Sequence, residues 1–260
     1  MINIFNILLK KQLLIISILF LISGFALSNN VNSILDSAKA NYLNGKYTEA
    51  IDNYEKIIAL NYESPELYYN LANSYFKNNK LPQAILNYER AKLLNPQDEY
   101  INTNLEIART YVEDNIEEIP EFFLKSWINS IKYAFSSNNW AIISVSGFIL
   151  LLIFLLFYLF STTIIIKKLS FWLGIILFII SIFSFILAFQ QKNIIRKHNV
   201  AIIFEPTVTI KSSPDESGTD LFLLHEGTKV SLLDSVGTWI EIKIADGNVG
   251  WLKAENLEKF

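Results

Sequence analysis

The chain of 260 residues has no cysteine, one methionine and only two histidines. Without cysteine it can form no disulfide, zinc–thiolate site or cysteine nucleophile. His198 lies at the edge of a domain and His225 in an expected strand–turn region, whereas a metal site needs several convergent ligands. We therefore expect both histidines to be surface or structural residues, and we predict no metal site and no cofactor.

Enzyme motifs are missing as well. There is no glycine-rich phosphate loop and no His-Glu-x-x-His helix. Four carboxylates lie close together at Glu113, Asp114, Glu117 and Glu118. Catalytic carboxylates need a pocket that perturbs their pKa, so we interpret this run as solvated charge between two domains. The segments described below account for the whole sequence and leave no independent catalytic core, so we predict that the protein is not an enzyme.

Basic charge is scarce in the two polar regions. Residues 29–119 carry 8 basic and 14 acidic side chains, residues 198–260 carry 5 and 10, and the stretch between them carries 7 and 1. Nucleic-acid binding needs clustered Lys and Arg to neutralise phosphates. The acidic balance of both regions therefore argues against nucleic acid as a partner.

Apolar residues, in contrast, make up 52% of the chain. The first run lies in residues 1–28, where Lys10 and Lys11 precede it and the small residues Ala26 and Ser28 stand where a cleavage site needs them. This pattern predicts a secretory signal peptide. An uncleaved anchor is the alternative and gives the same orientation, with the following domain outside.

Two further runs, 140–160 and 169–189, contain 21 residues each and no charge. A helix of about 20 residues spans a hydrocarbon core of about 30 Å, so both runs are predicted to be transmembrane helices. The link between them, 161–168, contains Lys167 and Lys168 and is predicted to be a cytoplasmic turn.

The two spans leave both polar regions on the same side of the membrane. Lys192, Arg196 and Lys197 follow the second span and favour a cytoplasmic position for it, but the first export segment usually dominates. We therefore predict a multi-pass protein of the bacterial cytoplasmic (inner) membrane, with both polar regions on the periplasmic or extracytoplasmic side.

Residues 120–138, just before the first span, have the pattern of an amphipathic helix. This predicts an interfacial helix that lies on the bilayer. A helix packed under the preceding domain is the alternative, because periodicity does not distinguish lipid from protein. Lys125, Asn129 and Lys132 share the polar face, and the apolar face holds Leu124, Trp127, Ile128, Ile131 and Phe135.

Within a domain predicted at 29–119, the chain repeats itself from Ile34 to about Asp114 with a period of 34 residues. A small Ala lets two helices approach closely, and the aromatic residue four positions later fills the space beside it. Pro96 ends the second copy because it lacks an N–H. Gly45, Tyr47, Ala50, Tyr54 and Ile57 of the first copy correspond to Asn79, Leu81, Ala84, Tyr88 and Ala91 of the second.

This period resembles that of tetratricopeptide (TPR) repeats, with copies at about 34–67 and 65–98 and a capping helix at 99–114. The resemblance implies a concave groove lined by the first helix of each pair, in which Asn side chains grip an extended peptide and aromatic rings add contact area. Ordinary packing or exposed roles are the alternative for each residue. The implied protein-binding positions are Tyr42, Tyr69, Asn70, Asn73 and Phe76, with Asn104 as a further one.

From residue 198 to 260 short apolar–polar alternating runs are separated by turn residues, which predicts a small all-β barrel. The segment resembles bacterial SH3-like domains at Val208-Thr209-Ile210-Lys211, Ser213-Pro214, Glu226-Gly227-Thr228-Lys229-Val230, Trp239, Asp246-Gly247 and Gly250-Trp251. Trp251, on a closing strand, is expected to pack in the core. Trp239 is a tentative ligand-binding residue, with core packing as the equal alternative.

The fold class is thus a multidomain membrane protein of all-α TPR repeats, a two-helix transmembrane hairpin and an all-β SH3-like barrel. The order of segments resembles the BatE-type TPR and SH3-like proteins of bacterial aerotolerance (Bat) operons. That resemblance implies membrane partners with von Willebrand factor A domains, a MoxR-type ATPase system and a role in stress tolerance. We predict a non-catalytic scaffold for membrane or periplasmic proteins. The alternative is a peptidoglycan-binding protein, because many bacterial SH3-like domains resemble wall-binding modules.

Overall fold

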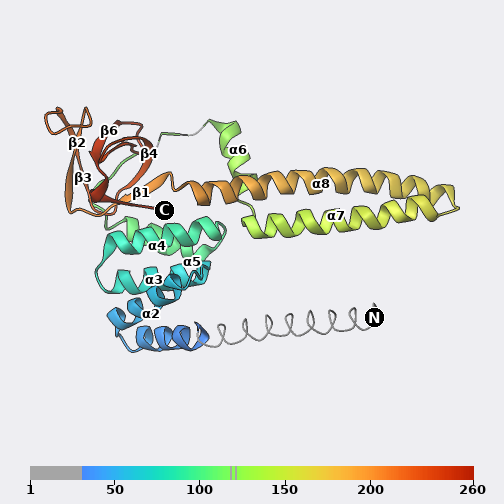
Figure 1. Cartoon of the computed structure of the whole chain (residues 1–260), viewed down its shortest axis with the longest axis horizontal. Helices are drawn as coiled ribbons and strands as arrows, with labels where there is room; N and C mark the ends of the chain where they lie inside the picture. The colour runs from blue at the N-terminus through green and yellow to red at the C-terminus, as the bar shows by residue number, and fades with distance from the viewer. Residues whose placement is uncertain (1–30, 118, 121) are drawn as a thin grey trace, which may run out of the picture.

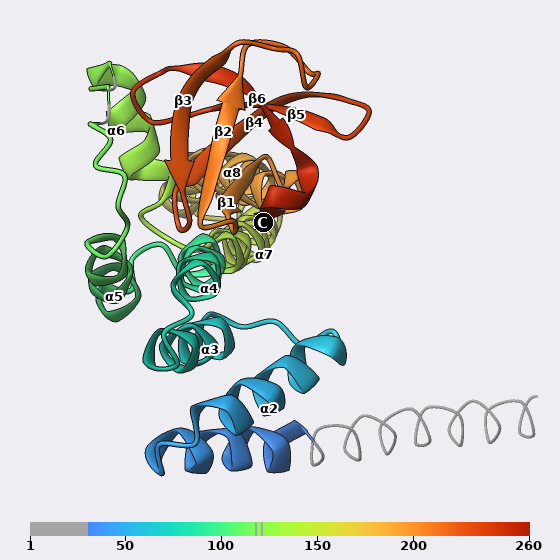
Figure 2. The same cartoon turned by 90° about the vertical axis from the view of Figure 1, so that its left-hand side faces the viewer.

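The computed structural model describes residues 31–117, 119–120 and 122–260, so the predicted signal segment 1–28 lies outside the described residues. The helices before residue 110 and the strands after residue 199 lie together at one end of a long helical hairpin (Figure 1). Viewed from that end, the strands lie above the helices, and α6 (Phe123–Lys132) lies to one side (Figure 2).

The repeat region forms antiparallel helix pairs. The 34-residue period places Tyr54 and Tyr88 at equivalent buried positions, and it places Gly45 and Asn79 at equivalent turns where φ is +75° and +58°. Ser64 and Asp98 cap the helices that follow them by accepting hydrogen bonds from the backbone N–H three residues later. The helices are a first helix over 31–43, α2 (Tyr47–Ala59), α3 (Pro65–Lys77), α4 (Leu81–Leu94) and α5 (Glu99–Arg109).

The hairpin consists of α7 (Ser137–Phe160) and α8 (Ile164–Lys197), both long and apolar enough to cross a membrane. Small residues let the two helices approach closely, and the hydroxyls of Ser144 and Ser181 each donate to the other's backbone carbonyl at 3.0 and 2.9 Å. The predicted turn at 161–168 is too long. Only residues 161–163 are non-helical, because nothing in the next five residues breaks a helix and both lysines join α8.

The amphipathic helix α6 is attached to the base of the hairpin. The side chains of Trp140 and Gln191 both donate to the backbone carbonyl of Lys132 at its end, and Gln191 also donates to the carbonyl of Phe135. Trp127, on its apolar face, is 64% exposed. The repeat helices therefore do not cover this face, as the alternative of a helix packed under the preceding domain would require.

The strands form one open antiparallel sheet in the order β3-β2-β6-β5-β4-β1-β7, and not the closed barrel that the sequence predicted. Among the described strands β7 pairs with β1 alone, and it lies beside the helices, where Arg90 of α4 contacts Glu258 and the carbonyl of Lys259. Edge strand β3 is therefore left without a closing partner. The strands are β1 (Val200–Ile203), β2 (Thr207–Lys211), β3 (Asp220–His225), β4 (Lys229–Val236), β5 (Trp239–Lys243), β6 (Val249–Lys253) and β7 (Leu257–Lys259).

The helices and the sheet share a hydrophobic core. Ile202 of β1 and the terminal Phe260 are buried in the same cluster as Ile85 and Leu105 of the repeats. Gly227, in the turn before β4, adopts a φ of +86°, and a Cβ there would lie 3.1 Å from Ile85. This turn therefore rests directly on α4.

Gly227→Ala tests this contact. We expect a loss of about 2–3 kcal/mol in the free energy of unfolding, because both the positive φ and the tight contact oppose a Cβ. Gly237→Ala is the matched control, since Gly237 also has a positive φ, of +60°, but open space beside it. Denaturant unfolding of the detergent-solubilised full chain measures both variants. Equal losses would show that the turn does not need close contact with α4.

Candidate binding surfaces

Helices α3, α4 and α5 share a connected set of polar side chains. The Asn73 side-chain carbonyl accepts hydrogen bonds from the Tyr88 hydroxyl at 2.6 Å and from Asn104 Nδ2 at 3.0 Å. Asn104 Nδ2 also lies 2.9 Å from the Tyr69 hydroxyl. Three of the residues assigned to the groove from the resemblance, on α3 and α5, are thus brought together. Asn73, however, uses its oxygen within the protein and so acts first as a positioning residue.

Half-buried aromatic rings extend this surface in both directions. Tyr42 on the first helix contacts the Tyr47 ring edge-on at 5.5 Å, and Phe76 on α3 contacts Tyr111 edge-on at 5.4 Å. Burial raises the pKa of the Tyr42 hydroxyl, with further contributions from Tyr47 and Tyr69. The hydroxyl therefore stays protonated and can donate a hydrogen bond.

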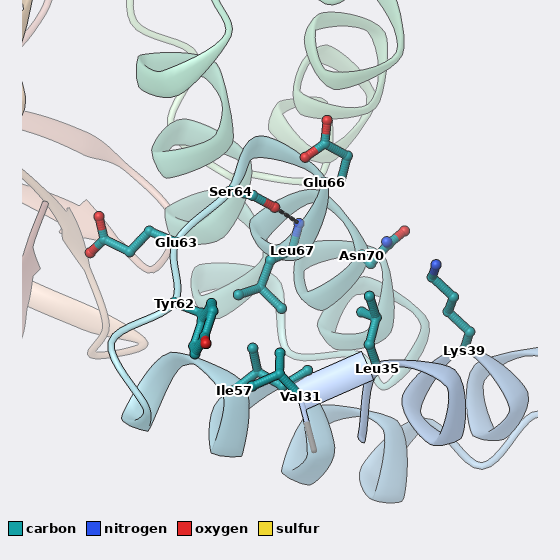
Figure 3. A pocket seen from close by; sticks show the side chains of 10 residues that line it. All are labelled: Val31, Leu35, Lys39, Ile57, Tyr62, Glu63, Ser64, Glu66, Leu67 and Asn70. Carbon is teal, nitrogen blue, oxygen red and sulfur yellow. Dashed lines mark hydrogen bonds between the residues drawn. The ribbon is translucent and has the colours of Figure 1, made fainter. Parts of the chain in front are cut away.

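Asn70 lies beside a cavity of about 200 Å³ between the first helix, the end of α2 and the start of α3. Its side-chain amide makes no hydrogen bond to another described residue, and Lys39 faces the same space from the first helix (Figure 3). Leu35, Ile57 and Leu67 form an apolar floor. The cavity can take a small apolar side chain, with an amide and an ammonium group at its edge.

Both tryptophans of the sheet lie on its outer face. Ile240 and Leu252 point into the core, so their neighbours Trp239 on β5 and Trp251 on β6 point outward, and both are half-buried. The expectation that Trp251 packs in the core is therefore wrong. The inward position belongs to Gly250, where a Cβ would collide with Ile210. The Lys253 ammonium lies 5.9 Å from the centre of the Trp239 ring.

A buried carboxylate connects the repeats to the sheet. Glu89 of α4 is only 2% exposed, and it accepts from Arg109 of α5 at 2.5 Å and from Lys229 of β4 at 2.7 Å. Burial alone would raise the pKa of Glu89, but the two cations hold it below its usual value. The ionised carboxylate therefore attracts one cation from the repeats and one from the sheet, which are the two modules of the fold.

A second connection lies where α5 leads into the following segment. Asp114 accepts from the backbone N–H of His225 at 2.7 Å and from the Thr228 hydroxyl at 2.5 Å, and it contacts the His225 ring at 2.7 Å. Burial opposes ionisation, but these hydrogen bonds keep the pKa of Asp114 low, and the bond to Asp114 raises that of His225. The interpretation of Asp114 as solvated charge is therefore wrong, whereas its neighbour Glu113 is exposed.

Sequence reasoning missed the residues that join the modules, namely Glu89, Arg109, Lys229 and Phe260. One signal was available for Glu89, because it occupies the same repeat position as Glu55, 34 residues earlier. Glu55 is exposed, and among the described residues it accepts a hydrogen bond from the Tyr75 hydroxyl alone. Repeat position therefore identifies a carboxylate but not its burial, which depends on the sheet.

Comparison with known protein families agrees with both modules. The family described as "TPR repeat" matches residues 38–79, and "Tetratricopeptide repeat" matches residues 65–98. "Bacterial SH3 domain" matches residues 206–258. No curated protein matches the chain. The predicted resemblance to TPR repeats and to a bacterial SH3 domain is therefore confirmed.

The Glu89 ion pairs give a pH prediction. A carboxylate whose pKa falls on folding stabilises the fold above its unfolded pKa, about 4.3, and this contribution is lost as the pH falls through the folded pKa. At pH 7 we expect Glu89→Gln to cost about 3 kcal/mol, because it leaves two cations beside a neutral amide. The variant should also lose less stability than the wild type between neutral and acidic pH.

Glu55→Gln is the control for this measurement, because it makes the same change at the same repeat position on the surface. It should cost less than about 1 kcal/mol. Denaturant unfolding of the full chain across the acidic range measures both variants. Similar losses for the two would contradict the assignment of Glu89 as the connecting charge.

Proposed function

We propose that the protein is a non-catalytic, membrane-anchored scaffold that binds protein partners through the TPR groove, with the SH3 region as a second contact. The observation that supports this most is the fixed position of two candidate binding surfaces. Glu89 is buried and the Asp114 side chain is 12% exposed, and each carboxylate connects the repeats to the sheet by hydrogen bonds. Two surfaces held in this way can orient two partners relative to each other.

The chemistry of the groove suits an extended polypeptide. Half-buried Tyr42, Tyr69 and Phe76 offer apolar area with little side-chain entropy to lose. Asn70 offers both a donor and an acceptor to a peptide backbone, and the adjacent cavity offers space for one side chain. A peptide fits this arrangement if it places an apolar side chain in the cavity and has a neighbouring hydrogen-bond acceptor for the Lys39 ammonium.

We further propose that α7 and α8 cross the bacterial inner membrane and hold both modules at the extracytoplasmic face. Their outward side chains are apolar and exposed along the hairpin, as lipid contact requires. The bacterial SH3 match agrees with a place in the cell envelope. The order of segments further suggests an aerotolerance or stress-related membrane complex whose partners carry von Willebrand factor A domains.

Affinity capture tests the groove. The tagged full chain, solubilised from its native membrane, is compared with a Lys39→Ala/Asn70→Ala variant, and co-purified proteins are quantified by mass spectrometry. Loss of two hydrogen-bonding groups should lower partner recovery about ten-fold or more.

The control for this capture is Asn53→Ala/Lys56→Ala, which removes the same residue types from α2, where the Lys56 ammonium donates to the Asn53 side-chain oxygen at 3.5 Å. It should recover partners like the wild type. The same proteins at equal yield from all three baits would contradict binding at this site.

A second candidate function is peptidoglycan binding by the sheet, favoured by the outward, half-buried Trp239 with Lys253 beside it. In this case purified cell wall should sediment both the wild type and the Lys39→Ala/Asn70→Ala variant. Trp239→Ala should reduce the sedimented fraction about five-fold, because a stacking ring is lost. Failure of the wild type to sediment with wall would remove this candidate.

A further inference from the structure

Several cationic side chains lie at one end of the hairpin, just beyond the uncharged run of α8. The uncharged run of α8 ends at residue 189, but the helix continues for eight more residues that include Lys192, Arg196 and Lys197. All three side chains are exposed, and Lys192 and Arg196 share a helix face because they are four residues apart.

The end of α6 adds a fourth cation at the same level. Gln191 of α8 donates to the carbonyl of Lys132, the last residue of α6, so this terminus lies next to the turn of α8 that carries Lys192. Trp140 of α7 holds the same carbonyl. Three helices therefore keep this group of cations together, at the end of the hairpin nearest the sheet (Figure 1).

Among the described residues, none of these four cations forms an ion pair with a carboxylate. The helix dipole of α8 favours Arg196 and Lys197 in its last turn, which is a role without a ligand. The dipole of α6 likewise favours Lys132 in its last turn, where its ammonium lies 4.4 Å from the centre of the Tyr133 ring. Neither dipole accounts for Lys192 or explains the apolar surface of α6 beside these cations.

We propose that Lys132, Lys192, Arg196 and Lys197 form a cationic collar that binds the anionic headgroups of the phospholipid leaflet on which the two modules lie. Exposed Leu124, Trp127 and Ile128 of α6 continue the apolar surface of the hairpin into the same leaflet. Both modules have an acidic balance, so an anionic leaflet repels them while it attracts the collar. This charge separation keeps the groove directed away from the lipid.

This inference rests on the proposed membrane anchoring, and the experiment separates the two. The full chain is reconstituted in nanodiscs of phosphatidylcholine mixed with an equal amount of phosphatidylglycerol, and the lipids that stay bound after release into detergent are counted by native mass spectrometry. The collar variant is Lys192→Gln/Arg196→Gln/Lys197→Gln. The control, Lys46→Gln/Lys56→Gln/Lys80→Gln, removes equal charge from exposed positions of the repeats.

We expect the wild type and the control to retain phosphatidylglycerol in preference, and the collar variant to lose this preference about five-fold or more. Equal retention of both lipids by the wild type, or an unchanged preference in the collar variant, would overturn the collar. A collar variant that melts earlier than the wild type by the same amount in pure phosphatidylcholine and in the mixture would assign the charges to the helix dipole instead. Release of the chain from native membranes by alkaline carbonate would overturn the membrane anchoring itself.

Discussion

The ionised side chain of Glu89 is buried between helices and sheet, and its two cations come from different parts of the chain. Arg109 belongs to the repeats and Lys229 to the sheet, so the carboxylate has both partners only when the two modules are docked. A buried charge that loses a partner is costly, which makes separated modules unfavourable. Asp114 and Phe260 also hold the two modules together, by hydrogen bonds and by burial in the shared core.

The parts of the fold that follow a local period were predictable from the sequence. The 34-residue repeat located both helix pairs, and the two uncharged runs located the long helices, because periodicity and hydropathy depend on the segment alone. Alternation located a strand-rich segment at 198–260, although β7 is only three residues long and, among the described strands, pairs with β1 alone. In the groove, the aromatic and Asn positions came from the resemblance, and the structure brings Tyr69, Asn73 and Asn104 together there.

What the sequence could not predict depends on contacts between distant segments. Asp114 was taken for solvated charge because its partners, His225 and Thr228, lie more than 100 residues away. Trp251 was assigned to the core, but side chains alternate along β6 and the inward positions belong to its neighbours Gly250 and Leu252. The sequence could not predict the hydrogen bonds of Asn73 to Tyr88 and Asn104 either. Because of these bonds the Asn73 side chain positions its neighbours, whereas the Asn70 side chain is available to a ligand.

Helix α8 is continuous over 34 residues, so at about 1.5 Å per residue it is a rod of about 50 Å, and it ends two residues before β1 begins. Only His198 and Asn199 separate the rod from the first strand. A tilt or rotation of the hairpin is therefore transmitted to the sheet, because a connection of two residues cannot absorb a large movement. Because the sheet is docked to the repeats, the same movement would turn the groove as well, so that the two surfaces change direction together.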